Sequence, residues 1–302
     1  MSDPANRIEK IRRTIANIAI DTGQNIIIPA LVRRETAGQN DDGVKIDESL
    51  PTDKAAARYI NSRLRRAYPN AMLISEEIER QGDEERGFII DPLDGTGNAS
   101  GRRPHLRNVF GVSIAYFEGD KVLAGAVFFP ALNKLMADGN GSAHPRTASG
   151  LANLRVSGNN YAELMTPPEQ ARVAQRIAWF EGMRQDHAWK NVPKFCATYE
   201  LLRTIMKADG TNLHWSPSLL YVWDIAASTL MARQRGLMTI NLETGKPLDL
   251  VGDFSVHRQG DAYRRPVGAI TAHPLLLEKI LNGMTFLPHH VQADCGETHP
   301  PA

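Results

Sequence analysis

The sequence is poor in cysteine and nearly free of net charge, and each of these features narrows the function. Cys196 and Cys295 are the two cysteines, too few and too distant along the chain to predict a disulfide framework or a zinc site. Lysine plus arginine (35) and aspartate plus glutamate (34) nearly cancel, so no whole-protein field would collect nucleic acid or an anionic membrane. We expect reduced thiols and a small-molecule partner, with neither a nucleic acid polymer nor a membrane.

Long hydrophobic runs are missing too. No run of about eighteen apolar residues occurs, and the first residues lack a basic region followed by an apolar stretch. These absences predict a cytoplasmic protein. At 302 residues, 42% of them hydrophobic, the chain is long enough to bury a large core, either as one layered unit or as two intimate halves.

The first half of the chain predicts an α+β arrangement. A helix is expected after Ser2-Asp3-Pro4, where isoleucines recur at helical spacing, and a second after Thr52-Asp53, one of which would cap it. Apolar runs predict buried strands at 71–74 and 87–90 and an antiparallel hairpin at 109–117 and 122–130.

The second half alternates helical and strand-like stretches and predicts an α/β arrangement. We therefore divide the chain into an N-terminal half, 1–154, a C-terminal half, 155–287, and a tail, 288–302. The tail is polar and rich in proline and histidine, which predicts flexibility.

Four acidic residues stand where buried elements begin or end. Asp91 and Asp94 follow the apolar run of "FIIDPLDGTGNAS" (88–100), Glu76 ends another apolar run, and Asp224 begins a helical stretch. Oxygen ligands without cysteine or histidine suit Mg²⁺, and the carbonyl group of Leu93 can serve as well. Two such ions about 3.5 to 4 Å apart would clamp a phosphate and activate a water molecule.

The residues after Asp94 add a second phosphate-binding feature. If a helix begins there, the backbone amides of Gly95 and Thr96 would face the phosphate oxygens. Each feature alone also has a structural reading. Asp-Pro and Asp-Gly favour turns, an acid in a first helical turn stabilises the helix, and Asp53 alone is a helix cap. Their joint occurrence favours a site.

Several separated stretches resemble the inositol monophosphatase family, the magnesium-dependent, lithium-sensitive phosphatases related to fructose-1,6-bisphosphatase. The resemblance spans about residues 8 to 285, and it implies a layered α/β/α/β/α sandwich, a Mg²⁺-dependent phosphoric monoester hydrolase and, as in many family members, a homodimer. The stretches that carry it are "PTDKAAARYI", "SEEIE", "DPLDGTGN", "WDIAAS" and "GLMTINLETGKPLDL".

The resemblance also implies roles for individual residues. It assigns two or three Mg²⁺ ions to Glu76, Asp91, the Leu93 carbonyl, Asp94 and Asp224. Asp53 and Thr96 match the pair that orients the attacking water, with Glu76 also catalytic. Glu77 matches a neighbour of the metal-binding glutamate, and Lys45 lies near a basic residue of the family.

The sequence departs from the family where the substrate would be held. Arg102 and Arg103 belong to a longer, basic segment that also holds His105 and Arg107 and would suit a second anionic group. The acid that receives inositol hydroxyls is replaced by Ser216, Pro217 and Ser218. The small Gly-Thr-Ala stretch is here Ala197, Thr198 and Tyr199, which puts a bulkier group in the substrate wall.

These observations predict an enzyme that hydrolyses a small polyol or sugar phosphate through metal-activated water. Asp91 and Asp94 are three residues apart, which does not fit the two-residue spacing of phosphatases with a nucleophilic aspartate. Two alternatives stay open. One is a bisphosphate substrate, such as fructose 1,6-bisphosphate or a 3'-phosphonucleotide. The other is a non-catalytic protein that binds a phosphorylated metabolite on the same scaffold.

Overall fold

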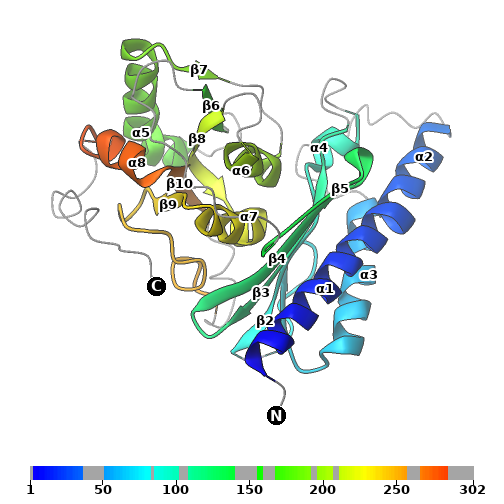
Figure 1. Ribbon diagram of the computed structural model, residues 1–302. Helices are drawn as coiled ribbons and strands as arrows, with labels where there is room; N and C mark the ends of the chain where they lie inside the picture. Colours follow the sequence, from blue (N-terminus) through cyan, green and yellow to red (C-terminus); the bar gives the residue numbers. More distant parts are fainter. Residues whose placement is uncertain are drawn as a thin grey trace.

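Two five-stranded sheets, with helices between and outside them, make up the described part of the chain (Figure 1). The computed structural model describes residues 3–36, 51–82, 85–101, 108–139, 155–158, 167–191, 196–206, 211–256 and 266–284. The first sheet has the order β1-β2-β3-β4-β5, with β1 Met72–Ser75, β2 Arg86–Asp94, β3 Gly111–Glu118, β4 Lys121–Phe129 and β5 Lys134–Ala137. The second has the order β7-β6-β8-β10-β9, with β6 Arg155–Gly158, β7 Lys190–Asn191, β8 Thr211–Leu220, β9 Met238–Asn241 and β10 Val267–Ala272.

The helices form three layers around these sheets. Helices α1 (Pro4–Thr22) and α3 (Pro51–Ala67) cover the outer face of the first sheet. Helices α6 (Ala197–Met206) and α7 (Val222–Gln234) lie between the sheets, and α5 (Pro167–Asp186) and α8 (Pro274–Leu281) pack on β8 and β10 of the second. This order confirms the predicted α/β/α/β/α sandwich. The division near residue 154 stays a prediction.

The N-terminal helix is longer than its isoleucine pattern predicts. Asp3 caps α1, because its Oδ1 accepts a hydrogen bond of 3.1 Å from the Ala5 amide. The helix continues through a π-helical turn, Gly23–Ile27, into α2, Ile28–Thr36. In the described part of the chain, Pro4–Arg33 is long and apolar enough to cross a membrane, although core helices pass the same test. Its buried isoleucines pack on β3 and β4.

Two predicted boundaries are wrong. Helix α3 begins at Pro51, a residue suited to the first helical position, so Thr52 and Asp53 lie inside its first turn and neither is the cap. Strand β2 does not end before Asp91 in a turn but continues through Asp94. The expected hairpin is confirmed as β3 and β4, which pair from Val112 and Phe128 to the turn at Gly119-Asp120.

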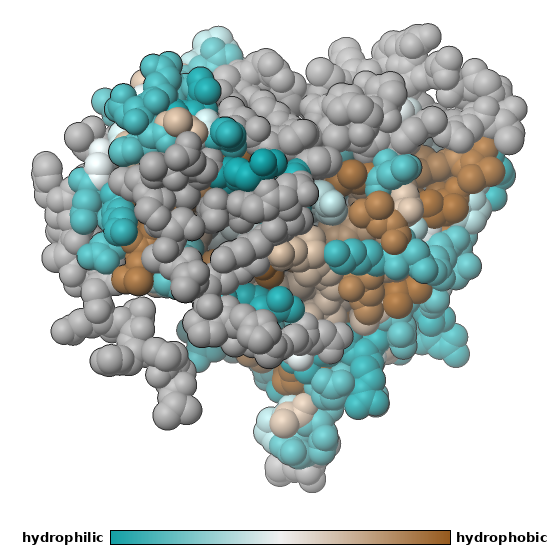
Figure 2. Space-filling view, turned by 45° about the horizontal axis from the view of Figure 1, so that its top comes forward, coloured by the Kyte–Doolittle hydropathy of each residue, from teal (hydrophilic) through white to brown (hydrophobic). Residues whose placement is uncertain are grey.

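Exposed hydrophobic side chains are few on the described surface. Figure 2 shows brown areas on the right-hand side, where α2 lies in Figure 1, among mostly hydrophilic residues. The large hydrophobic residues exposed on the described chain are Val32 of α2, Leu132 just before β5, Leu135 of β5 and Leu275 of α8. The remaining apolar residues fill three buried clusters, one behind the first sheet, one between the sheets and one behind the second.

Candidate active site

Two parallel strand ends bring the first acidic residues together. Strands β1 and β2 pair in parallel with Ser75 opposite Ile90, so Glu76 and Asp91 follow at the same edge of the sheet. Asp91 is buried, whereas Glu76 is exposed. The two acids thus lie at one edge of the sheet and differ in their exposure to solvent.

A bulge in β2 places Asp91 and Asp94 on one face of the sheet. Residues three apart on a regular strand point to opposite faces. Here Asp91 pairs with Ser113 and Asp94 with Gly111, so three steps on β2 match two steps on β3. The extra residue restores the side-chain phase. The segment Pro92-Leu93 thus aims both carboxylates the same way, which the sequence pattern alone did not reveal.

The chain then turns at Gly95 into a short helix, α4 (Thr96–Ala99), as predicted after Asp94. Gly95 has φ +88°, and a Cβ there would lie 2.9 Å from Cys196 Cβ and 3.1 Å from the Val109 carbonyl oxygen. Only glycine fits this left-handed, crowded position without strain. Asn98 fixes the same turn, because its side-chain amide donates a 2.7 Å hydrogen bond to the Val109 carbonyl.

Helix α3 brings Asp53 to this turn. Asp53 is buried, and the Thr96 hydroxyl lies 3.2 Å from Asp53 Oδ2 and 3.0 Å from the Leu93 carbonyl oxygen. The hydroxyl has one proton to donate and two acceptors within reach. The structure thus brings together Asp53 and Thr96, which the resemblance pairs, although they are separated by 43 positions in the sequence.

The first turns of α6 and α7 close the other side. The Thr198 amide donates a 2.8 Å hydrogen bond to Asp94 Oδ2, and the Cys196 thiol also bonds this carboxylate. The Thr198 hydroxyl donates to the Asp224 backbone carbonyl at 2.8 Å, which ties the two helix starts together. Asp224 Oδ2 in turn accepts a 2.8 Å bond from the Tyr221 amide.

Burial and mutual repulsion raise the pKa values of these acids. Desolvation raises the pKa of Asp91 well above its usual range, and the charges of Glu76, Asp94 and Asp224 raise it further. Burial, then the charges of Asp94 and Glu76, raises the pKa of Asp224 in the same way. The pKa of Asp94 is raised by burial, with the bonds from Thr198 and Cys196 opposing the rise.

The set of donor groups fits a hard cation. The other three acids raise the pKa of Asp91, whereas Asp94 and Glu76 raise the pKa of Asp224, and neither a histidine nor a lysine is among these groups. In the described part of the chain, no three acidic, histidine or cysteine side chains converge closely enough to hold an ion as they stand. Each aspartate instead turns one oxygen to a backbone amide, at Leu93, Thr198 or Tyr221. A divalent cation would relieve the repulsion that the fold itself leaves in place.

The predicted substrate wall is only partly at this site. Thr198 contacts Asp94, and Ala197 is buried beside it. The Tyr199 ring packs edge-on against Phe129 of the first sheet, with centroids 5.1 Å apart, and the Arg203 guanidinium of α6 lies 6.0 Å from its centroid. Glu77 is half-buried after Glu76. Lys45, Arg102, Arg103, His105, Arg107, Cys295 and the tail lie outside the described residues.

Sequence reasoning missed one buried ionisable pair next to the site. Glu200 of α6 and His214 of β8 are both buried, with Glu200 Oε2 3.9 Å from His214 Nε2. Burial lowers the pKa of His214 to about 4. Because the two residues are brought together by packing of α6 on β8, no local sequence signal marks them.

The layered α/β/α/β/α sandwich is the fold of inositol monophosphatase-type proteins. The chain belongs to the inositol monophosphatase family, whose model matches residues 12–282. This membership confirms the resemblance drawn from the motifs.

Individual relatives agree with this assignment. A Nus factor SuhB from Haemophilus influenzae is 26% identical over 275 residues, covering 88% of this chain and 94% of that protein. An inositol monophosphatase from Dictyostelium discoideum is 24% identical over 209 residues, 67% of this chain and 74% of its own. Inositol monophosphatase II from Staphylococcus aureus has the same fold, with a TM-score of 0.69 at 18% identity over 96% of this chain and 99% of that one.

Proposed function

We propose that this protein is a Mg²⁺-dependent phosphomonoesterase that hydrolyses a small polyol or sugar phosphate. The observation that carries the proposal is the gathering of Asp91, Asp94, Asp224 and Glu76 at the seam of the two sheets, where the charges of the other three acids raise the pKa of Asp91 and those of Asp94 and Glu76 raise the pKa of Asp224. Such a cluster is stable in its fully ionised form only with a cation among the carboxylates.

The ligands for two or three Mg²⁺ ions would be these four carboxylates and the Leu93 carbonyl oxygen. When bound, the ions supply positive charge that polarises a phosphate ester and makes a water molecule more acidic. Asp94 is held in place for this role by the Thr198 amide and the Cys196 thiol. Glu77 is an auxiliary candidate because it follows Glu76 at the same strand end.

The chain itself supplies the group that orients the attacking water. The Thr96 hydroxyl lies between Asp53 Oδ2 and the Leu93 carbonyl oxygen. It would accept a hydrogen bond from the attacking water and donate its own hydrogen bond to Asp53. The amides of Gly95 and Thr96 precede the first hydrogen bond of α4, which the Asn98 amide donates to the Gly95 carbonyl. They would bind phosphate oxygens.

The substrate class follows from what surrounds the seam. Ser216 and Pro217 are buried in β8 where inositol enzymes of the family carry an acid. We therefore favour a polyol or sugar phosphate other than inositol phosphate. A bisphosphate is the second candidate, because Arg102 and Arg103 follow α4 in the sequence and would pair with a second phosphate group.

A non-catalytic role is the alternative of another class. Relatives of the chain carry the name Nus factor SuhB, which does not describe an enzyme. The Asp53–Thr96 contact argues for catalysis, because a protein that only binds a phosphorylated metabolite has no need of a group that orients water. We keep the cytoplasmic location and the homodimer as parts of the proposal.

A substrate panel tests the proposal. Inorganic phosphate release would be measured on inositol, sugar, histidinol and nucleotide mono- and bisphosphates, with Mg²⁺, with EDTA, and with Mg²⁺ plus Li⁺. Mg²⁺-dependent release from monophosphates is expected. An R102A/R103A double variant that loses rate on bisphosphates alone would favour the second candidate. Binding without release across the panel would favour the non-catalytic role.

A further inference from the structure

Strand β8 carries a bulge shortly before the start of α7. Ser216 pairs with Ala269 of β10, and Leu220 pairs with Val267, so four steps on β8 match two steps on β10. The residues between Ser216 and Leu220 therefore include two extra ones, which bend the strand. Pro217 suits this place, because it has no amide hydrogen to donate to the ladder. Bulges beside an active site commonly re-aim the chain.

Arg176 of α5 holds this bulge. Its Nη1 donates a 3.0 Å hydrogen bond to the Pro217 carbonyl oxygen, and Nη1 and Nη2 donate to the two carboxylate oxygens of Glu243, at 2.9 and 2.8 Å. Gly268 of β10 makes room, because a Cβ there would overlap the Pro217 carbonyl group and lie 3.1 Å from Arg176 Nη1. Arg176 is 7% exposed, and we call Arg176, Glu243 and the Pro217 carbonyl group the β8 clamp.

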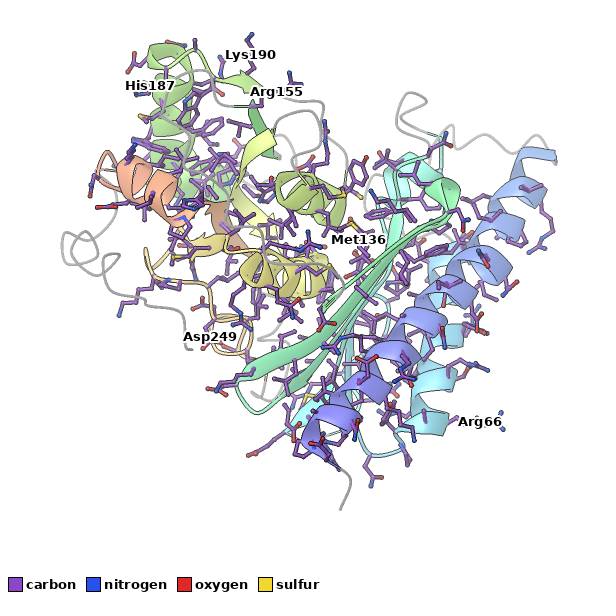
Figure 3. The ribbon with its side chains drawn as sticks, in the orientation of Figure 1. Arg66, Met136, Arg155, His187, Lys190 and Asp249 are labelled. Atoms are coloured by element: carbon purple, nitrogen blue, oxygen red, sulfur yellow. The ribbon has the colours of Figure 1, made fainter. Side chains whose placement is uncertain are left out.

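The β8 clamp joins three elements around the second sheet, which are α5, β8 and the turn after β9. The Leu242 amide donates a 2.9 Å hydrogen bond to the Gly268 carbonyl, which places the next residue, Glu243, beside the bulge. Figure 3 shows His187, just after α5, and Asp249, beyond the turn, in the same half of the molecule. The clamp thus lies entirely within the half that contains the second sheet.

The clamp reaches β8 from the face opposite the candidate active site. His214 lies 3.9 Å from Glu200 of α6, whereas Trp215 stacks on Phe180 of α5 with ring centroids 4.8 Å apart. Side chains alternate along a strand, so Ser216 points toward α6 as His214 does. Because α6 closes the candidate active site, the clamp acts on that site through the backbone of β8. Its arginine is therefore a positioning residue.

The metal candidate Asp224 is anchored independently of the clamp. Beyond the bulge the ladder resumes at Leu220 and Val267. The Tyr221 amide donates to Asp224 Oδ2 and the Thr198 hydroxyl to the Asp224 carbonyl oxygen, both at 2.8 Å. Loss of the clamp should therefore change the shape of the bulge more than the position of this metal candidate.

We propose that the β8 clamp determines substrate specificity by fixing the bulge as a wall for the non-phosphate part of the substrate. The inference rests on the proposed function and on the place of Ser216 and Pro217 in that wall. A bulge leaves backbone groups of its extra residues outside the ladder, and such groups bind the hydroxyl groups of a polyol but not an aryl ring. A buried ion pair adds little net stability but fixes one geometry of this wall.

Steady-state kinetics of the full-length protein with saturating Mg²⁺ tests the specificity. The two substrates are phenyl phosphate and the polyol or sugar phosphate of the panel with the highest kcat/KM. In R176M, kcat/KM should fall at least about tenfold for the polyol or sugar phosphate, mainly through KM, and change within about twofold for phenyl phosphate. R184M removes an arginine of the same helix, paired with Glu181 at 2.6 Å, and should match the wild type on both.

Two further variants keep the test available if R176M does not fold. R176K keeps the charge but loses the bidentate contact, and E243Q keeps the shape of the carboxylate but not its charge. Each should lower the ratio of the two kcat/KM values by about threefold, in the same direction as R176M.

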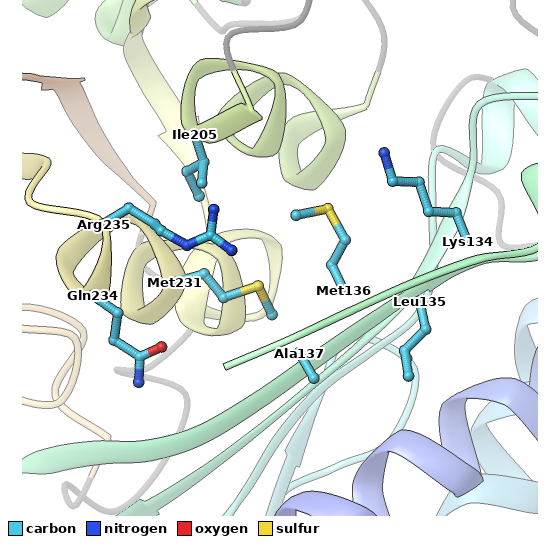
Figure 4. A pocket seen from close by; sticks show the side chains of 8 residues that line it. All are labelled: Lys134, Leu135, Met136, Ala137, Ile205, Met231, Gln234 and Arg235. Carbon is cyan, nitrogen blue, oxygen red and sulfur yellow. The ribbon is translucent and has the colours of Figure 1, made fainter. Parts of the chain in front are cut away.

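Hydrogen exchange of backbone amides gives a readout that needs no activity. The amides of residues 216–220 should exchange faster in R176M, whereas those of β2 should not change. R235M is the control for loss of a half-buried arginine. Figure 4 shows Arg235 pointing into a separate pocket of about 190 Å³, whose lining residues come from β5, α6 and the end of α7. This variant should leave the exchange of residues 216–220 and both kcat/KM values within about twofold of the wild type.

Equal losses on the two substrates, or unchanged exchange of residues 216–220 in R176M, would overturn the inference and leave the proposed function in place. Absence of phosphate release by the wild type from every polyol and sugar phosphate would overturn the proposed function and this inference with it.

Discussion

Two buried acids lie at helix α6, and they differ in the groups that surround them. Asp94, bonded to the first turn of α6, faces Asp91 and Asp224, so acid faces acid. Glu200, three residues into the same helix, lies 3.9 Å from the imidazole of His214. Asp94 lies among other carboxylates, whose charges a cation from outside the chain would balance, whereas Glu200 lies beside an imidazole whose lowered pKa keeps it neutral. A buried acid therefore indicates a functional site when its neighbours are also acids.

The two regions also respond to pH with opposite signs. The raised pKa values of Asp91 and Asp224 stabilise the metal-free fold below the usual aspartate pKa, and this contribution is lost as pH rises through the raised values. His214 has a lowered pKa, so its contribution is lost as pH falls from 6.5 toward about 4.

The largest expected effect comes from removing one carboxylate from the cluster of Asp91, Asp94 and Asp224. D91N removes a central carboxylate while keeping its shape and its hydrogen bond from the Leu93 amide. We expect kcat to fall by at least about a thousandfold, about 4 kcal/mol, since the ions would lose a ligand. Phosphate release with saturating Mg²⁺ measures this. D120N, in the exposed β3–β4 turn, is the control and should keep the wild-type rate.

The next largest effect is expected from replacing His214, which lies beside Glu200. Between pH 6.5 and 4, His214 takes up a proton in the unfolded chain but not in the folded one, where it is buried. Lowering the pH over this range therefore lowers the free energy of unfolding of the wild type by about 3 kcal/mol. In H214Q, the free energy of unfolding should fall by about 3 kcal/mol less than in the wild type over this pH range. Urea unfolding at several pH values measures it, with H187Q, next to the end of α5, as the control. Equal pH slopes for H214Q and wild type would contradict the assignment.

Mg²⁺ binding should affect the stability of the acidic cluster but not that of the Glu200–His214 pair. A cation that relieves repulsion among Asp91, Asp94 and Asp224 should stabilise the fold, by about 2.7 kcal/mol at a hundredfold excess over Kd. Thermal unfolding with Mg²⁺ and with EDTA tests this. D91N should lose most of the shift and H214Q should keep it. A shift of the same size in D91N would place the ion elsewhere.

The smallest effect concerns the backbone that presents Thr96. G95A puts a Cβ 2.9 Å from Cys196 Cβ at φ +88°, which should destabilise the fold by about 1 to 2 kcal/mol. G97A, one turn position further in α4, meets no atom within 4 Å and serves as the matched control. Chemical denaturation compares the two. Equal stabilities would show that the Gly95 conformation is not required.

The sequence predicted the acids and their elements but not how the elements meet. The sequence was enough to predict three of the site acids, Asp91, Asp94 and Asp224, because each stands at the end of an apolar run or at the start of a helical stretch. The bulge that puts Asp91 and Asp94 on one face depends on the register with β3, and the Thr198 bond to Asp94 depends on docking of α6. The Glu200–His214 pair is also a product of non-local packing, and β5 is too short and exposed to show a pattern.

The most direct test of the acidic cluster is a Mg²⁺ titration of phosphate release by the EDTA-treated full-length protein, on the best substrate of the panel. We expect no release in EDTA, a saturable rise with Mg²⁺ in the wild type, and no rise in D91N. Release that persists in EDTA, or a D91N variant that responds to Mg²⁺ like the wild type, would contradict this expectation.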